Sequence, residues 1–140
     1  MDSTAGRRVL SSAFYSSTVR RQTFDRLDLT SVVFGSGLLW LDRCTFVGAD
    51  LRQATLDGCH FKMCDFTSAK LRGASARGAA FAGCDMRDAD LRDLDLTYAE
   101  FSVVTSGSTN GYRTDVTGAD LNGARMDHAV LEEVIGWPLR

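Results

Sequence analysis

Apolar side chains recur at every fifth position through the middle of this chain. From residue 46 to residue 101 these positions hold large apolar residues, with one alanine: Phe46, Leu51, Leu56, Phe61, Phe66, Leu71, Ala76, Phe81, Met86, Leu91, Leu96 and Phe101. A second series lies two residues earlier and, apart from one leucine, contains small apolar residues: Cys44, Ala49, Ala54, Cys59, Cys64, Ala69, Ala74, Ala79, Cys84, Ala89, Leu94 and Ala99. Helices repeat apolar positions every three or four residues and strands every two, so a strict period of five fits neither. The period predicts a solenoid whose short sides each turn one large and one small side chain inward.

Residues twenty positions apart are chemically alike, which indicates four sides per coil. One such set contains Phe46, Phe66 and Met86, and the set two residues before it contains Cys44, Cys64 and Cys84. In a coil of twenty residues the members of each set would stack at the spacing of paired strands, about 4.8 Å.

Three stretches spell out a short motif: Ala49-Asp50-Leu51, Ala89-Asp90-Leu91 and Ala119-Asp120-Leu121. This motif resembles the A(D/N)LXX repeat of the pentapeptide-repeat family. The resemblance implies an all-β fold, a right-handed quadrilateral β-helix, and the length of the repeat region corresponds to about five to six coils.

The repeat pattern divides the chain into three parts. Residues 1–13 form an N-terminal segment, for which flexibility is one option, and residues 14–131 form the β-helix. The spacing slips by two residues between Phe34 and Leu41, which predicts a bulge near residues 35–41. Residues 102–113 are either a loop or degenerate repeats, and Asn110-Gly111 favours a loop. Residues 132–140 break the pattern and are either a cap or a dimerisation tail.

Composition and charge exclude several classes of function. The 16 Lys and Arg residues against 18 Asp and Glu residues give a net charge of −2, which disfavours direct nucleic-acid binding. No stretch approaches the ~20 apolar residues of a membrane span, and the N-terminus lacks the apolar region of a signal peptide. We therefore expect a cytoplasmic protein with reduced cysteines, and the preference for arginine over lysine suggests a bacterial source.

No metal, cofactor or catalytic motif is predicted. The four cysteines are spaced by twenty and five residues, without the C-x₂-C pair of a zinc site. A stacked column cannot surround an ion tetrahedrally, so these cysteines are interpreted as small buried residues. The two histidines lie in no hydrolase motif, and no phosphate-binding glycine loop is present, which favours a non-enzymatic protein.

Three groups of residues are candidates for binding. The first is the segment 106–113 with Asn110, Tyr112 and Arg113, because loops on rigid scaffolds concentrate recognition residues. The second is an acidic set that precedes the large inward residue on four successive sides, with a solvated mixed-charge surface as the alternative: Asp85, Asp90, Asp95 and Glu100. The third comprises Ile135 and Trp137, as an end cap or a homodimer contact.

The family resemblance implies one function in particular. Members of its best-characterised branch bind DNA gyrase, a type II topoisomerase, as mimics of duplex DNA, and confer antibiotic resistance or self-protection. Arginines two residues after Asp50, Asp85 and Asp90 would neutralise much of the acidic surface that such a mimic requires. Two alternatives stay open: an interaction scaffold for another protein, and an unorthodox enzyme or small-molecule binder that uses residues 106–113.

Overall fold

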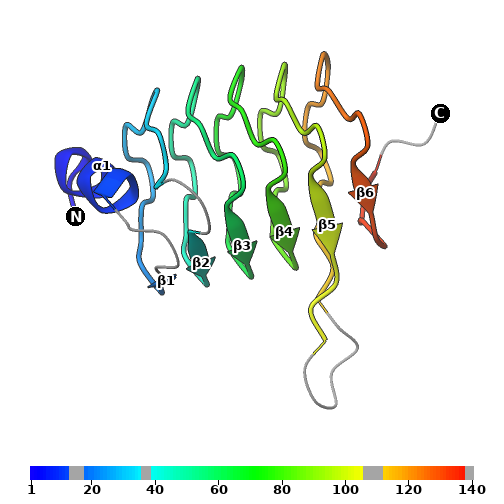
Figure 1. Ribbon diagram of the computed structural model, residues 1–140, viewed down its shortest axis with the longest axis horizontal. Helices are drawn as coiled ribbons and strands as arrows, with labels where there is room; N and C mark the ends of the chain where they lie inside the picture. Colours follow the sequence, from blue (N-terminus) through cyan, green and yellow to red (C-terminus); the bar gives the residue numbers. More distant parts are fainter. Residues whose placement is uncertain (13–17, 36–38, 106–111, 138–140) are drawn as a thin grey trace.

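The computed structural model describes residues 1–12, 18–35, 39–105 and 112–137. Its sheet contains six parallel strands in chain order, one from each level of a solenoid (Figure 1). The strands are β1 (Thr18–Arg20), β2 (Trp40–Asp42), β3 (His60–Lys62), β4 (Ala80–Ala82), β5 (Glu100–Ser102) and β6 (Val130–Leu131). The other three sides are joined by single parallel bridges, such as Thr45 with Asp65, Asp50 with Lys70 and Thr55 with Ser75. The prediction of an all-β, four-sided solenoid is confirmed.

The pairing of the strands measures the length of each turn. Leu41, Phe61, Phe81 and Phe101 lie opposite one another, so the turns between β2 and β5 are twenty residues long. Val19 pairs with Leu41, which makes the first turn two residues longer. Residues 36–38, part of the predicted bulge, lie outside the described residues.

The last turn, from β5 to β6, is thirty residues long, since Phe101 pairs with Leu131. About four turns therefore precede this lengthened one, and the predicted number of five to six coils was slightly too high. The difference arises because the last turn takes thirty residues instead of twenty.

Except after Phe101, each side that the structure describes has one residue in a left-handed backbone conformation, two positions after the large inward residue. Glycine occupies this place at Gly48 (φ 64°), but Gln53 (φ 62°) and Ser68 (φ 58°) adopt the same conformation. Left-handed residues reverse the local direction of the chain and are tolerated as single residues. A corner at every fifth residue explains why the apolar period is five.

Aromatic rings stack along the axis of the solenoid and fill its core. The Phe46 and Phe66 rings lie 4.9 Å apart and nearly parallel, and the Phe61 and Phe81 rings lie 5.1 Å apart. The two columns meet edge to face, with 5.2 Å between the ring centroids of Phe61 and Phe66. All four side chains are essentially inaccessible to water, so the predicted inward series forms the core.

A helix, α1 (Ser3–Ser12), covers the N-terminal end of the solenoid (Figure 1). The Asp2 carboxylate caps it by accepting a hydrogen bond from the Ala5 N–H (2.8 Å). Gly6 lets the helix approach closely, since a Cβ there would lie 2.6 Å from Leu27 Cδ1. Leu10 is fully buried against the first level of the core. The five-residue pattern contained no signal for this helix, because it lies outside the repeats.

Side chains of α1 also bind the exposed backbone of the first level. Ser3 Oγ accepts a hydrogen bond from the Asp28 N–H (2.9 Å), and Arg7 donates to the carbonyl oxygen of Thr30 (2.9 Å). The helix therefore buries apolar core and pairs backbone groups at the same time. In the part of the chain that the structure describes, no helix is long and apolar enough to cross a membrane.

Replacing Phe66 with alanine tests the importance of the stacked core. The ring is fully buried between Phe46, Phe61 and Phe81, so we expect Phe66→Ala to lower the free energy of unfolding by about 3–5 kcal/mol. Chemical denaturation followed by circular dichroism measures this change. The control is Val33→Ala, at a side chain that is 59% exposed, where the expected change is within about 0.5 kcal/mol. Equal effects of the two substitutions would contradict the packing described here.

Candidate functional site

The acidic candidates surround the solenoid instead of lining one side. Asp85, Asp90 and Asp95 form bridges on three different sides, to Asp115, Asp120 and Arg125 of the next level. Glu100 begins β5 on the fourth side. These four carboxylates therefore do not form a continuous acidic stripe.

Arginines two residues further along neutralise several of these carboxylates. Arg87 donates from Nε and Nη2 to the Asp85 carboxylate at 2.9 and 2.7 Å, and Arg92 binds Asp90 in the same way at 2.8 and 2.7 Å. The hydrogen bonds from these arginines hold the pKa of Asp85 and that of Asp90 below the usual value. Both carboxylates stay ionised, but each is paired.

Asp95 and Glu100 have different surroundings. The Thr97 hydroxyl donates to the Asp95 carboxylate and, with the Thr97 backbone N–H and Arg77, lowers its pKa. Glu100 is exposed and forms no ion pair among the described residues. Of the predicted acidic set, Glu100 alone presents an uncompensated charge in this part of the chain.

Residues 104 and 112 pair in antiparallel fashion where the long turn leaves β5. The Val104 N–H donates to the Tyr112 carbonyl at 2.9 Å, and the Tyr112 N–H donates to the Val104 carbonyl at 2.7 Å. Tyr112 lies over Gly83, where a Cβ would come within 3.0 Å of the Tyr112 carbonyl oxygen. Tyr112 and Arg113 are both exposed, whereas Asn110 lies outside the described residues.

The cysteines form part of the core. Three of their thiols donate to strand carbonyls of the preceding level: Cys44 to Val19 (3.3 Å), Cys64 to Leu41 (3.3 Å) and Cys84 to Phe61 (3.2 Å). Burial raises the pKa of the Cys59 thiol to about 12, so this thiol is protonated and unreactive at neutral pH. Among the described residues, no group of His, Cys, Asp and Glu is arranged to hold a metal ion.

Thr114 continues the cysteine column at the next level, which the sequence analysis missed. It is fully buried, and its hydroxyl donates to the Phe81 carbonyl at 3.2 Å. The Thr114 hydroxyl therefore donates to the strand of the level below, as the Cys84 thiol does one level earlier. The thirty-residue spacing between Cys84 and Thr114 concealed this equivalence.

The C-terminal end of the solenoid is the least covered part of its core. In the last level Leu131 is 40% exposed, whereas Phe101 directly below it is 1% exposed. Leu121 and Met126 occupy inward positions and are only partly buried. An end of this kind exposes apolar surface that each preceding level conceals under the next.

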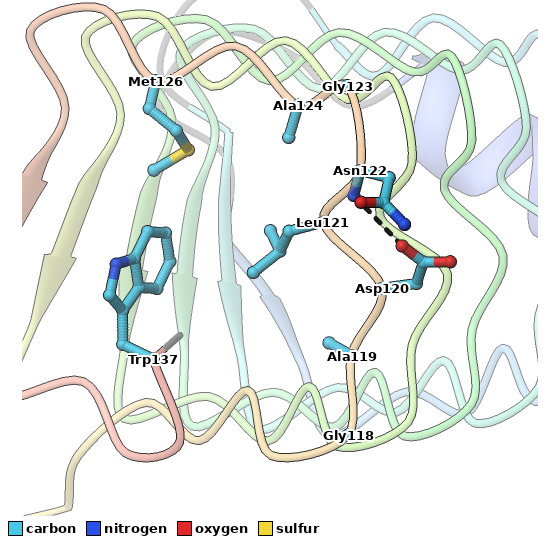
Figure 2. A pocket seen from close by; sticks show the side chains of 9 residues that line it. All are labelled: Gly118, Ala119, Asp120, Leu121, Asn122, Gly123, Ala124, Met126 and Trp137. Carbon is cyan, nitrogen blue, oxygen red and sulfur yellow. Dashed lines mark hydrogen bonds between the residues drawn. The ribbon is translucent and has the colours of Figure 1, made fainter. Parts of the chain in front are cut away.

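A hollow of about 750 Å³ opens at this end. In Figure 2, Met126 and Trp137 point toward one another across it, and Leu121 points between them. Its lining residues all come from the last level and the segment that follows: Gly118, Ala119, Asp120, Leu121, Asn122, Gly123, Ala124, Met126 and Trp137.

Unpaired backbone groups border the hollow. One level below, the Leu91 N–H donates to the Asp120 carbonyl and the Leu96 N–H donates to the Arg125 carbonyl, both at 2.8 Å. The equivalent N–H groups of Leu121 and Met126 find no acceptor among the described residues. Among the described residues this rim is therefore an unpaired strand edge, and an edge of this kind can pair with another extended segment.

Ile135 and Trp137 cover part of this end. The Ile135 N–H donates to the Thr114 carbonyl and its carbonyl accepts from the Val116 N–H, each at 2.9 Å, so the chain pairs along one side. The Trp137 ring lies 6.4 Å from that of Phe101. These contacts form a partial cap, and the predicted homodimer contact stays a prediction.

A second hollow, of about 590 Å³, lies on the outer surface. It is lined by polar and charged residues from several levels: Thr30, Ser31, Arg52, Gln53, Arg72, Gly73 and Asp93. Neither hollow is lined by Tyr112 or Arg113, so the predicted pocket beside residues 106–113 is not among these two.

Comparisons with known proteins agree with this architecture. Residues 56–105 match the family described as "Pentapeptide repeats (9 copies)". A pentapeptide repeat protein from the Arabidopsis thaliana thylakoid lumen has a similar structure, with a TM-score of 0.54, 24% identity and coverage of 94% of this chain and 68% of that protein. No curated protein sequence matches the chain significantly.

Two further solved structures are similar at lower TM-scores. QnrB1, a plasmid-mediated fluoroquinolone resistance protein, has a TM-score of 0.48 and 20% identity, over 86% of this chain and 63% of QnrB1. HetL from Nostoc sp. strain PCC 7120, a protein involved in heterocyst differentiation regulation, has a TM-score of 0.35 and 15% identity, over 96% of this chain and 94% of HetL. Because both TM-scores lie below 0.5, neither structure assigns the fold or the function of this chain.

The chain is a β-solenoid of parallel strands whose C-terminal end is incompletely covered. Residues 56–105 match the pentapeptide-repeat family, and the fold of the chain is that of a pentapeptide-repeat β-helix.

Acid titration tests the ion pairs on the surface. The pKa of Asp85 is lowered in the folded state, so the stability it contributes is present above the unfolded value of about 3.9 and is lost as the pH falls through the lower folded value. We expect Asp85→Asn to flatten the fall in the free energy of unfolding below about pH 4, measured by denaturation at a series of pH values. Glu100→Gln, which removes a carboxylate without an ion pair in the described residues, is the control for the loss of one negative charge. An unchanged slope in Asp85→Asn would contradict the pairing with Arg87.

Proposed function

We propose that this protein is a non-catalytic module that binds a protein partner through the C-terminal end of its solenoid. The observation that carries the proposal is the strand edge, unpaired among the described residues, beside the hollow that Leu121, Met126 and Trp137 help to line. A rigid column of stacked rings supports this end from below, so a partner meets a preformed surface. A cytoplasmic location stays part of the proposal.

The long sides of the solenoid give weaker support for a binding role. Asp50, Asp85 and Asp90 are each held by a neighbouring arginine, which leaves mixed charge on these sides. Such surfaces favour solubility and oppose association. The exposed pair Tyr112 and Arg113 could extend a contact made by the open end, and their role stays a prediction.

Amide hydrogen exchange tests whether the proposed edge is free. We expect the amides of Leu121 and Met126 to exchange far faster than those of Asp120 and Arg125, which donate to the Ala89 and Leu94 carbonyls. All four residues belong to the same level, so general fraying of the end cannot produce this alternation. Slow exchange at Leu121 and Met126 in the dilute protein would show that the edge is already covered, and the proposed site would be lost.

Binding to DNA gyrase as a mimic of duplex DNA is the second candidate function. The observation in its favour is that Asp85, Asp90 and Asp95 place carboxylates on three successive sides of the solenoid. The arginines bound to Asp85 and Asp90 oppose it, because a mimic of phosphates requires exposed negative charge.

A supercoiling assay with purified gyrase, with and without a quinolone, tests this candidate. The candidate requires inhibition or protection at about micromolar protein or below. It further requires Arg87→Gln with Arg92→Gln to strengthen the effect, because the substitutions uncover two carboxylates, and Asp85→Lys with Asp90→Lys to abolish it. Asp42→Lys, on a different side, is the matched control. No effect of the wild-type protein in either arm removes the gyrase candidate and leaves the binding-module proposal intact.

A further inference from the structure

The two ends of the solenoid differ in how their backbone groups are satisfied. At the N-terminal end, Ser3 and Arg7 of α1 bind the backbone of Asp28 and Thr30, and Leu10 fills the core. At the C-terminal end, the Ala119 carbonyl and the Leu121 N–H have no partner among the described residues. These two groups border the hollow, so its occupant must supply backbone donors and acceptors as well as apolar surface.

The geometry of the edge selects an extended segment. At every lower level of this side, a residue of the next coil donates its N–H to one carbonyl and accepts from the N–H two residues further on, as Asp120 does with Ala89 and Leu91. A parallel strand laid on residues 119–123 would repeat this pattern with Ala119 and Leu121. Its inward side chain would then point into the hollow between Leu121, Met126 and Trp137.

In such a strand, the residue paired with Asp120 would point outward and would extend a column of charged residues. In this column Asp50, Lys70, Asp90 and Asp120 bridge in succession. Lys70 lies between two carboxylates and contributes to the lowered pKa of Asp50, whereas Asp90 and Asp120 are adjacent like charges. Arg92 binds Asp90 closely and reaches Asp120 only at 3.9 Å. The place above Asp120 therefore favours a cation, as Lys70 is favoured above Asp50.

The net charge of the C-terminal end also favours a basic partner. Between residues 114 and 137 the sequence contains five carboxylates and Arg125 as its one arginine or lysine: Asp115, Asp120, Asp127, Glu132 and Glu133. Two copies that met end to end would bring these carboxylates together, which opposes a symmetric dimer. A basic partner meets complementary charge instead.

We propose that the C-terminal edge binds an extended segment of another protein in which apolar residues alternate with lysine or arginine. The segment adds a parallel strand along residues 119–123, places an apolar side chain in the hollow and sets a cation beside Asp120. This inference rests on the proposed function and specifies its partner.

Synthetic peptides test the chemistry of the partner. The probes are a short peptide that alternates isoleucine with lysine, and its counterpart with glutamate in place of lysine. The chain has two tryptophans, so Trp40→Phe leaves Trp137 as the reporter at the hollow. We expect the lysine peptide to shift Trp137 emission and to bind at least about tenfold more tightly than the glutamate peptide, a preference that weakens with added salt.

Substitutions in the acidic column locate the interaction. Asp120→Asn reduces the preference for the lysine peptide, and Asp120→Lys reverses it. Asp50→Asn, in the same column but covered by the next level, is the matched control and leaves the preference unchanged. Circular dichroism checks that each variant keeps its fold. Equal binding of the two peptides, or a preference that Asp120→Asn does not change, overturns the proposed partner chemistry.

Three further outcomes distinguish this inference from the proposed function. If both peptides bind equally and Leu121→Lys abolishes both, the open end remains a protein-binding site, and the requirement for basic residues is wrong. If neither peptide binds while the Leu121 amide exchanges rapidly, the edge is unpaired as the proposed function requires, but the alternating basic segment is wrong as its partner. A dimer in sedimentation that Leu121→Lys dissociates would identify a second copy as the occupant, which also overturns the inference.

Discussion

A left-handed backbone residue at every fifth position is the constraint on which the rest of this structure depends. Each such residue turns the chain at a corner, so every side has room for one large and one small inward side chain. Four corners close a level, and residues twenty apart become neighbours along the axis. Because neighbours are then of the same kind, phenylalanine stacks on phenylalanine and cysteine lies above cysteine. Local backbone conformation thereby sets the composition of the core.

Stacking of this kind leaves both ends of the column incomplete. Every interior level pairs its backbone and covers its core with the level above, but the first and last levels each lack one neighbour. The helix α1 replaces that neighbour at the N-terminal end, with Leu10 as the apolar contact and Arg7 and Ser3 as the hydrogen-bonding groups. At the C-terminal end, Trp137 and Ile135 replace it on part of the surface only. This asymmetry is why our functional proposals concern the C-terminal end.

The pairing of surface charges also depends on which residues are neighbours. An aspartate before the large inward residue and an arginine after it lie on the same outward surface, so they pair within one side, as Asp90 and Arg92 do. Such pairs keep the long sides close to neutral. At the last level this compensation fails, because Asn122 follows Leu121 where Arg92 follows Leu91. Asp120, which Arg92 reaches only at 3.9 Å, therefore lies beside the hollow at this end.

The sequence by itself determined the solenoid, its four sides, the inward residues and the burial of the cysteines. A period of five fits neither a helix nor a flat strand, so it requires a chain that turns at a corner after every five residues. The sequence also predicted the arginine pairs, since their spacing of two residues is local. Only the tertiary structure decided that α1 covers the N-terminal end, that Thr114 takes the place of a cysteine, and that Leu121, Met126 and Trp137 enclose a hollow. These features join residues at irregular separations, across the lengthened turn or outside the repeats. No periodic pattern reports such contacts, because they depend on which levels happen to have a neighbour.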